Sequence, residues 1–312
     1  MMKIFMNKFK TALKLAVVLF IVVVSTNEIA AREKADIEKL TEKANEGDRQ
    51  AQYDLGMLYY TGREVERNLE TGAGWFLKAA EQGHVEAQFA IGRCYFYGRG
   101  IPKDKALGVG WYYEAALQDH TQSIYALGEC YFLGEGIQKN HIEAINWYSK
   151  AAAKGERGAQ FSIARILDKG DPSVRNPSAA LAQYKKSARD GDAHAEYLVG
   201  TFYERGKGVP ADINRAIQSY KDAAHDSELA RVKLAGFYAN GIGVEADPIE
   251  AYKWLELSKL TVENDPPTRQ LKERLEAILT PEQIEAAKNL AASYTKRHNV
   301  IQDTLSNDFG YD

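Results

Sequence analysis

Apolar residues recur at helical spacing along most of this chain, in short blocks separated by glycine and by asparagine or aspartate. In residues 124–133 the apolar positions follow the spacing of one helix face. Gly134 and Gly136 then supply a helix stop and a turn, because glycine adopts the left-handed conformation without strain. Asn140 can cap a second helix over residues 143–153. The pattern predicts a helix–turn–helix hairpin.

This block returns at a fixed interval. Its first glycine recurs four times in steps of 36 residues and once after 35, with alanine in two of the six places. A period of about 20 to 50 residues is typical of stacked units that bury their apolar faces only against neighbours. The predicted fold class is therefore all-α, a right-handed α-solenoid of six stacked helix–turn–helix hairpins over residues 40–258. The six positions are Gly56, Gly92, Gly128, Ala164, Gly200 and Ala235.

The residues that start and pack each second helix repeat as regularly as the glycines. A small residue stands three places before an aromatic position, which allows two helices to approach closely. That aromatic position holds tryptophan in four units, and we expect Trp147 to be buried. Asparagine or aspartate precedes every second helix as its predicted N-cap. These N-caps are Asn68, Asp104, Asn140, Asn176, Asp212 and Asp247.

Residues 87–100, Ala-Gln-Phe-Ala-Ile-Gly-Arg-Cys-Tyr-Phe-Tyr-Gly-Arg-Gly, are followed at 111–116 by Trp-Tyr-Tyr-Glu-Ala-Ala. This combination resembles the Sel1-like repeat, a relative of the tetratricopeptide repeat. The resemblance implies a scaffold or adaptor for protein–protein interactions that assembles complexes, regulates envelope signalling or contacts host proteins. The fourth unit departs most from the pattern, because Gly170-Asp-Pro172 replaces Gly-x-Gly and predicts an altered turn.

The repeats are followed by a different segment. Asp265-Pro-Pro267 breaks the chain, and two helices are predicted over 269–279 and 281–297. Thr280-Pro-Glu-Gln283 is a capping-box signature for the second helix. The resemblance implies that residues 266–297 cap the last apolar face of the solenoid. Residues 298–312 lack a clear apolar period and are expected to form a flexible tail.

The N-terminus has the plan of a secretory signal peptide. Four lysines precede and flank a short apolar run over residues 15–24, and small residues follow at Ala30 and Ala31. An uncleaved membrane anchor is the alternative, but Lys14 interrupts the apolar segment, and a spanning helix needs about 20 apolar residues. Cleavage of residues 1–31 predicts a periplasmic or secreted bacterial protein with no stable membrane insertion.

Charge and motif content argue against several functions. The net charge is −3 with no basic patch, so nucleic-acid binding is not expected. The histidines are scattered, and His84 and His120 are one period apart, in equivalent loop positions. Neither a zinc-protease motif nor a phosphate-binding loop is present. We therefore expect no enzyme, metal or cofactor. The alternatives to a scaffold are a cell-wall or β-lactam-directed hydrolase and a secreted host-interacting effector.

The two cysteines, Cys94 and Cys130, are also one period apart. In an oxidising compartment they could form a disulfide. Both, however, stand two residues after the repeat glycine, where other units carry apolar side chains. Helices pack with axes about 8–10 Å apart, whereas a disulfide needs Cα atoms within about 7 Å. We expect buried free thiols.

Positions that vary among the six units are candidates for binding, because those that recur serve packing. On the first helix of each unit, a helical wheel places three varying positions away from the recurring stripe. They carry aromatic residues in the first units and basic residues later, a combination typical of protein-binding hot spots. The alternative is that the aromatics fill gaps between repeats. The candidate partner-binding residues are Tyr60, Arg93, Phe96, Tyr97, Phe132, Arg165, Lys169 and Arg205.

Overall fold

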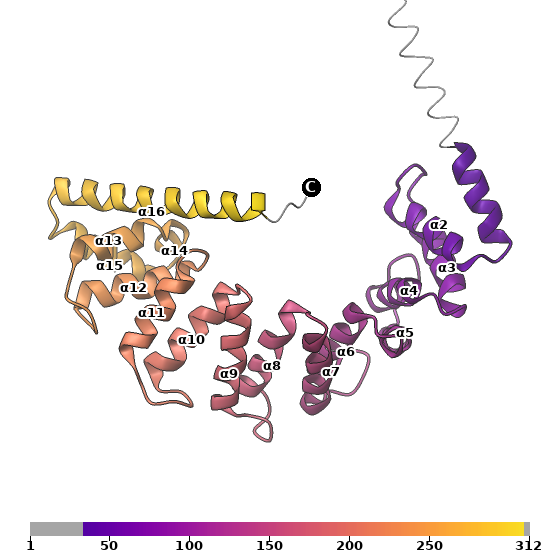
Figure 1. The fold of residues 1–312 in the computed structure, drawn as a ribbon, viewed down its shortest axis with the longest axis horizontal. Helices are drawn as coiled ribbons and strands as arrows, with labels where there is room; N and C mark the ends of the chain where they lie inside the picture. Colours follow the sequence, from indigo (N-terminus) through magenta and orange to yellow (C-terminus); the bar gives the residue numbers. More distant parts are fainter. Residues whose placement is uncertain (1–33, 309–312) are drawn as a thin grey trace, which may run out of the picture. The chain divides into compact units, whose positions relative to one another are not determined.

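The computed structural model describes residues 34–308, in which all regular structure is helical (Figure 1). The predicted signal peptide lies outside these residues. The chain divides into two compact units after Asn140. Unit 1 contains helix 34–45, α2 (Arg49–Thr61), α3 (Leu69–Glu81), α4 (Val85–Tyr97), α5 (Lys105–Leu117) and α6 (Thr121–Leu133). Unit 2 begins with α7 (His141–Ala153), α8 (Arg157–Lys169), α9 (Pro177–Arg189), α10 (Ala193–Arg205), α11 (Ile213–Ala223), α12 (Glu228–Asn240) and α13 (Pro248–Glu256), and ends with α14 (Lys259–Asn264), α15 (Pro266–Glu276) and α16 (Pro281–Asp308).

Consecutive helices pack as hairpins, and the hairpins stack. In unit 1, α2 packs on α3 and α4 on α5, while α3 contacts α4 and α5 contacts α6 across the stack. In unit 2, α8 packs on α9, α10 on α11 and α12 on α13, with α9–α10 and α11–α12 contacts between hairpins. The predicted α-solenoid of stacked helix hairpins is confirmed. Within residues 34–308, no helix combines the length and the hydrophobicity required to cross a bilayer.

The predicted caps start the second helices. The Asp104 carboxylate accepts a hydrogen bond from the Leu107 backbone N–H at 3.0 Å, which satisfies one of the free amides of the first turn. The same bond recurs in four other second helices, with Asn68, Asn176, Asp212 and Asp247 as acceptors. His84 and His120, which are predicted to occupy equivalent loop positions in successive repeats, are the N-caps of two first helices.

The repeat glycine is present because an aromatic ring lies directly on it. A Cβ atom added to Gly92 would be 2.8 Å from Cδ1 and Cε1 of Tyr112, and the rings of Phe76 and Tyr220 approach their glycines as closely. Tyr112 follows the tryptophan position and is only 3% exposed, whereas Trp111 is half-buried. The centre of each hairpin is therefore the residue after the tryptophan position, whether or not that position holds tryptophan. The predicted burial of Trp147 is confirmed, at 8% exposed.

The fourth repeat has the altered turn that its sequence predicts. Gly170 adopts an extended conformation, with φ −69° and ψ −167°, instead of the left-handed conformation of Gly98 and Gly134. The backbone N–H of Asp171 donates to Nδ1 of His141 at 3.1 Å, and the Asp171 carboxylate lies 2.8 Å from the same nitrogen. The missing second glycine is thus accompanied by a polar contact between this turn and the preceding hairpin.

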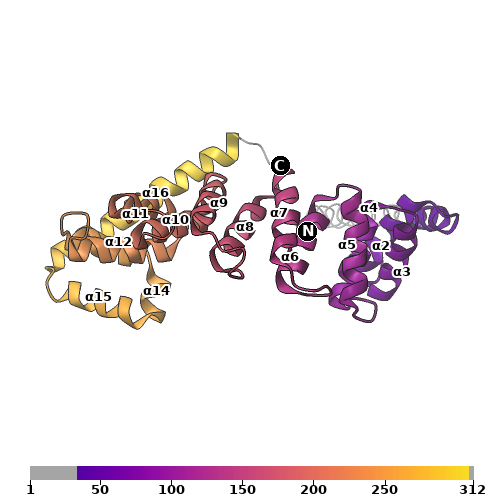
Figure 2. The same ribbon diagram turned by 90° about the horizontal axis from the view of Figure 1, so that it is seen from below.

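Three helices close unit 2, and α16 packs on α13. Figure 2 shows α15 and α16 running in different directions from the end of this unit. Leu275, Leu279 and Ala287 join the core that contains Leu255, so these helices cover the last apolar face. The capping box is confirmed, because the Thr280 N–H donates to Gln283 Oε1 at 2.9 Å. The predicted helix end at residue 297 is wrong, since α16 continues to Asp308; the flexibility expected for residues 298–312 stays a prediction.

The two cysteines lie in the core, as predicted. Cys94 is 1% and Cys130 2% exposed, and both are free thiols. Burial raises the pKa of the Cys94 thiol to about 11 and that of Cys130 to about 12. Because the reactive species is the thiolate, neither residue is suited to act as a nucleophile near neutral pH.

Candidate protein-binding site

A cavity of about 310 Å³ opens on unit 1. We call it the aromatic cleft. The helices α2, α3 and α4 and the start of α6 supply its walls. Its lining residues are Tyr53, Met57, Tyr60, Thr61, Phe76, Glu86, Phe89, Ala90, Arg93, His120 and Gln122.

Helical spacing brings these residues to one surface. On α2, Tyr53, Met57 and Tyr60 are separated by four and three residues, so they share one face of the helix. On α4, Phe89 and Arg93 are four residues apart in the same way. Neighbouring repeats therefore contribute equivalent faces of their first helices to the cleft.

Ring contacts hold the aromatic walls in place. The centroid of Phe76 lies 5.8 Å from that of Tyr53 and 5.6 Å from that of Tyr60. In the next repeat, the Phe89 and His120 rings are 4.9 Å apart. These distances are in the range preferred by interacting aromatic pairs. Because the rings support one another, the cleft is formed before any partner arrives, and binding has a smaller ordering cost.

The two cap histidines use Nδ1 as a hydrogen-bond acceptor. Nδ1 of His84 accepts from the Ala87 N–H at 3.2 Å, so its proton lies on Nε2, which donates to Gln50 Oε1 at 3.0 Å. Nδ1 of His120 accepts from the Ser123 N–H in the same way. Burial lowers the pKa of His120, with a smaller opposing effect of Glu86. His120 therefore contributes a neutral ring to the cleft at pH 7.

Charged groups of both signs stand at the cleft. Arg93 is exposed, and its guanidinium carbon lies 5.8 Å from the centroid of the Phe89 ring. The Glu86 side chain is 58% exposed. Burial raises the pKa of Tyr53, and the charges of Glu86 and Asp54 add to the effect, so its phenol stays neutral at pH 7. The cleft combines aromatic walls with one exposed cation and one exposed anion.

Two of the candidate residues from the sequence, Tyr60 and Arg93, line the cleft together. The exposure expected for Phe96 is wrong, because this residue is 7% exposed and its ring packs 5.9 Å from the centroid of Tyr112, beneath the Lys105 ammonium. Tyr97 is 55% exposed but does not line the cleft. Phe132 is half-buried. The aromatic row predicted from the sequence is thus divided between core and surface.

The basic candidates belong to unit 2. Arg165, Lys169 and Arg205 are exposed, and their role in binding stays a prediction. A different polar cavity, of about 320 Å³, lies in the same unit, where Tyr203 accepts hydrogen bonds from Lys185 at 2.6 Å and Arg215 at 3.4 Å. These bonds lower the pKa of Tyr203, against an opposing effect of burial.

Tyr53 and Phe89 line the cleft but are not among the candidate residues predicted from the sequence. Both recur at the same position of the repeat, and a recurring residue was interpreted as a packing residue. A signal was available, because Tyr53 precedes Met57 by four residues and Phe89 precedes Arg93 by four, which puts each on the varying face. Among residues 34–308 whose side chains the structure describes, no group of three or more His, Cys, Asp or Glu residues could hold a metal ion.

Comparison with known proteins agrees with the repeat architecture. Six segments match the Sel1 repeat family, at residues 49–84, 85–120, 121–156, 158–192, 193–224 and 229–259. A Sel1 repeat protein from Oxalobacter formigenes is 34% identical, with a TM-score of 0.63 over 76% of this chain and 98% of that chain. A protective antigen of uropathogenic Escherichia coli is 22% identical, with a TM-score of 0.33 over 88% and 82% of the two chains. The immunity protein Pa5087 from Pseudomonas aeruginosa is 20% identical, with a TM-score of 0.36 over 74% and 83%. The comparison with curated proteins gives no match.

Proposed function

Because the chain belongs to the Sel1 repeat family, we propose that it is an exported scaffold whose aromatic cleft holds a short segment of a partner protein. Sel1 repeats generally mediate protein–protein interactions, and their solenoids are typically non-enzymatic scaffolds. The observation that carries the proposal is the cleft itself, where aromatic side chains from two successive repeats meet beside Arg93. Tyrosine and arginine, both present in the cleft, are among the residues most enriched at binding hot spots.

The size and charge of the cleft define the segment that fits it. At about 310 Å³ it is close to the lower limit of roughly 300 Å³ for ligand pockets, so it accommodates one or two side chains and not a folded domain. The walls favour an apolar or aromatic side chain. Glu86 and Arg93 favour flanking residues of opposite charge. The partner segment is therefore a peptide with an apolar anchor and mixed charges beside it.

Export is part of the same proposal. A basic start, a short apolar run and small residues before position 32 support secretion across the inner membrane, followed by residence in the periplasm or outside the cell. Delivery into a host cell would use the same export step. In either location the scaffold would meet proteins of the envelope or of the surroundings.

The test compares two exposed apolar positions of unit 1. Met57 is 37% exposed and lines the cleft, whereas Leu117 is 62% exposed and does not. Met57→Asp should weaken binding of a captured partner by at least about 2 kcal/mol, or thirtyfold in Kd, because it places a charge against the anchor side chain. Leu117→Asp is the matched control and should bind normally.

The measurement has two stages. Partners are first captured from an envelope extract on the wild-type chain and identified by mass spectrometry, and the purified partner is then titrated calorimetrically with each variant. Both variants should keep the wild-type melting temperature, because both side chains are exposed. Equal affinity of Met57→Asp and wild type for every captured partner would show that binding takes place elsewhere. Loss of binding by Leu117→Asp as well would show that the effect is not specific to the cleft.

A further inference from the structure

The four turns that contain two glycines lie against the start of the preceding second helix. A Cβ atom on Gly100 would be 2.1 Å from the carbonyl oxygen of Leu69, the first residue of α3. Only glycine allows this approach, because any side chain would overlap the receiving backbone. We call the receiving residue the seat. A close backbone contact likewise joins Gly136 to Lys105 and Gly208 to Pro177, whereas Gly243 lies against the side chain of Ile213; each receiving residue is the first of its helix.

In four turns the middle residue pairs with a polar group of the repeat that receives the turn, whereas the last turn has the exposed Ile242 at this position. The Glu135 carboxylate, for example, lies 2.8 Å from the Lys105 ammonium at the seat. Three turns are thus held by two elements, a backbone contact that requires glycine at Gly100, Gly136 and Gly208, and a side-chain pair that matches the receiving surface. The observed pairs are Arg99 with the Tyr60 hydroxyl, Glu135 with Lys105, Asp171 with His141, and Lys207 with Asp168.

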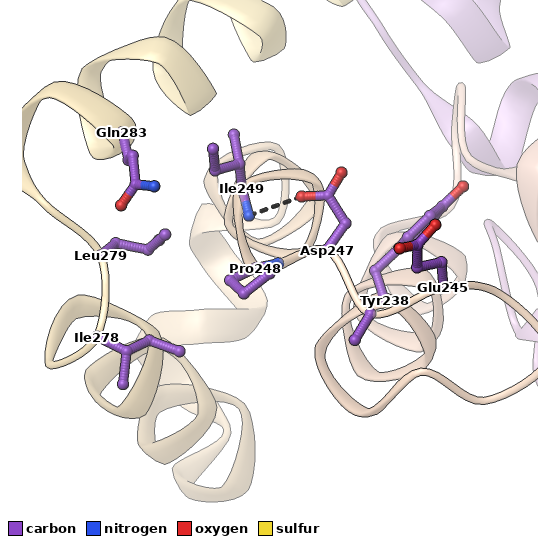
Figure 3. Close-up of a pocket in the computed structure, with 9 residues that line it drawn as sticks. Tyr238, Glu245, Asp247, Pro248, Ile249, Ile278, Leu279 and Gln283 are labelled. Atoms are coloured by element: carbon purple, nitrogen blue, oxygen red, sulfur yellow. Dashed lines mark hydrogen bonds between the residues drawn. The ribbon is translucent and has the colours of Figure 1, made fainter.

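No turn within residues 34–308 lies on the last seat, Pro248. Helix α13 begins at Pro248 after the cap Asp247, in the same way that α9 begins at Pro177 after Asn176. In place of a seventh hairpin, the chain continues into α14–α16. A cavity of about 530 Å³ remains at this seat (Figure 3), and we call it the terminal groove. Its lining residues are Tyr238, Glu245, Ala246, Asp247, Pro248, Ile249, Ile278, Leu279 and Gln283.

The terminal groove is apolar and acidic. In Figure 3, Ile278 and Leu279 lie on one side, Pro248 and Ile249 in the centre, and Glu245 on the other side. Ile278 is 66% exposed, which is high for an isoleucine. The lining includes two carboxylates and no cationic side chain. The turn that fits this seat would therefore carry a basic middle residue.

A second copy of this chain does not supply that turn. The internal turns of a second copy already contact their own preceding hairpins. Its first turn follows no complete hairpin in the described chain, but this turn has Glu64 at the position of the second glycine. Glu64 is exposed and adopts a φ of 65°, so its backbone has the conformation of the glycine turns. Its side chain, however, would overlap a receiving helix and would place a carboxylate in an acidic groove.

We propose that the terminal groove binds a Gly–Lys–Gly or Gly–Arg–Gly turn of a partner protein, seated on Pro248 as the chain's own turns are seated on equivalent residues. The glycine meets the backbone at the start of α13, the basic side chain pairs with Glu245, and the residue after the turn contacts Ile278. This surface shares no residue with the aromatic cleft, and the proposal does not depend on the function proposed for the cleft.

The probe is a peptide with the sequence of residues 97–104, Tyr-Gly-Arg-Gly-Ile-Pro-Lys-Asp, which contains a natural basic turn and is closed by a disulfide between cysteines added at its two ends. It is titrated into the full chain carrying labelled isoleucine methyl groups and followed by NMR. The methyl signals of Ile249 and Ile278 should shift and saturate. Replacing the second glycine of the peptide by valine should raise Kd at least about tenfold. Replacing its arginine by glutamate should have a similar effect, and Glu245→Lys should reverse that preference.

Ile278→Asp is the loss-of-binding variant, and its melting temperature should equal that of the wild type because the side chain is exposed. The absence of saturable shifts with millimolar peptide would overturn the proposal, as would equal binding of the valine peptide. A concentration-dependent dimer in sedimentation that Ile278→Asp abolishes would assign the groove to a second copy and also overturn it.

Discussion

Replacing Gly92 by alanine should destabilise the protein, although alanine is the better helix former. The added Cβ would lie 2.8 Å from two atoms of the Tyr112 ring, well inside ordinary van der Waals contact. The ring has little room to move, because it is 3% exposed and packs against the rings of Phe89 and Phe96 at 5.7 and 5.9 Å. The fourth repeat combines Ala164 with Tyr184, so we expect a ring shift and not loss of the fold.

Gly110 in α5 isolates the magnitude of this effect. No atom lies within 4 Å of a Cβ added there, so Gly110→Ala should gain about 1 kcal/mol from helix propensity alone. Gly92→Ala makes the same gain but adds an overpacking cost of roughly 1–3 kcal/mol. The difference in unfolding free energy between the two variants should therefore be about 1–3 kcal/mol, in favour of Gly110→Ala.

Urea unfolding followed by circular dichroism measures both variants, alone and in a Tyr112→Leu background. In the last repeat, Ala235 occurs together with Leu255 instead of a ring, so the smaller side chain should make room for the Cβ. In the Tyr112→Leu background, Gly92→Ala should therefore not lower the unfolding free energy. If Gly92→Ala stabilised the wild-type chain as much as Gly110→Ala does, contact with the ring would not be the reason for the repeat glycine.

Four further predictions address the core, the caps, the thiols and export. Trp147→Ala should lower the unfolding free energy by about 3–5 kcal/mol, and a loss below roughly 1 kcal/mol would mean that the side chain is not a core residue. Asp104→Ala should cost only about 1 kcal/mol in the same assay, as the loss of one cap. Cys94 and Cys130 should resist a thiol reagent at pH 8 and react with it in urea. Their folded pKa values of about 11 and 12 exceed the unfolded value of 9.0, so their contribution to stability is complete below pH 9 and declines as pH rises toward 12. Urea unfolding midpoints measured at a series of pH values can follow this decline. Intact mass of the chain exported by a Gram-negative host should correspond to a first residue of Arg32, and full-length protein in the membrane fraction would instead indicate an anchor.

Local signals predicted most of the fold. Asp104 identifies a helix start because its carboxylate bonds within its own turn, and Gly98 identifies a helix end because its backbone is left-handed. Packing between hairpins was harder to predict. Trp111 and Tyr112 are adjacent and both lie near the apolar stripe, so the choice of the central aromatic depends on the neighbouring helix, and that information is absent from either segment alone.

Packing between hairpins also limited how well the candidate site could be predicted from the sequence. A helical wheel treats Phe96 as a surface residue because it considers one helix at a time, but Lys105 from the following helix covers its ring. The wheel placed Tyr60 and Arg93 correctly because no later segment covers them fully. Tyr53 and Phe89 were excluded from the candidate binding residues for a different reason, because they recur among the repeats. A recurring residue can both pack within the repeat and line a surface. Position in the stack, which the sequence does not state, decides between these roles.

The contact between a turn and its seat also bears on how such a chain lengthens during evolution. A segment of one period carries a glycine turn that fits the hairpin before it and a seat that fits the turn after it. In-frame duplication of such a segment therefore creates a new junction whose halves already match, with no compensating substitution. Two turns depart from this rule: the fourth turn has Pro172 in place of the second glycine, and the first turn has Glu64. A hairpin added in front of Glu64 would meet a side chain where glycine is required. Gene duplication would thus extend the array from within and not at its N-terminal end.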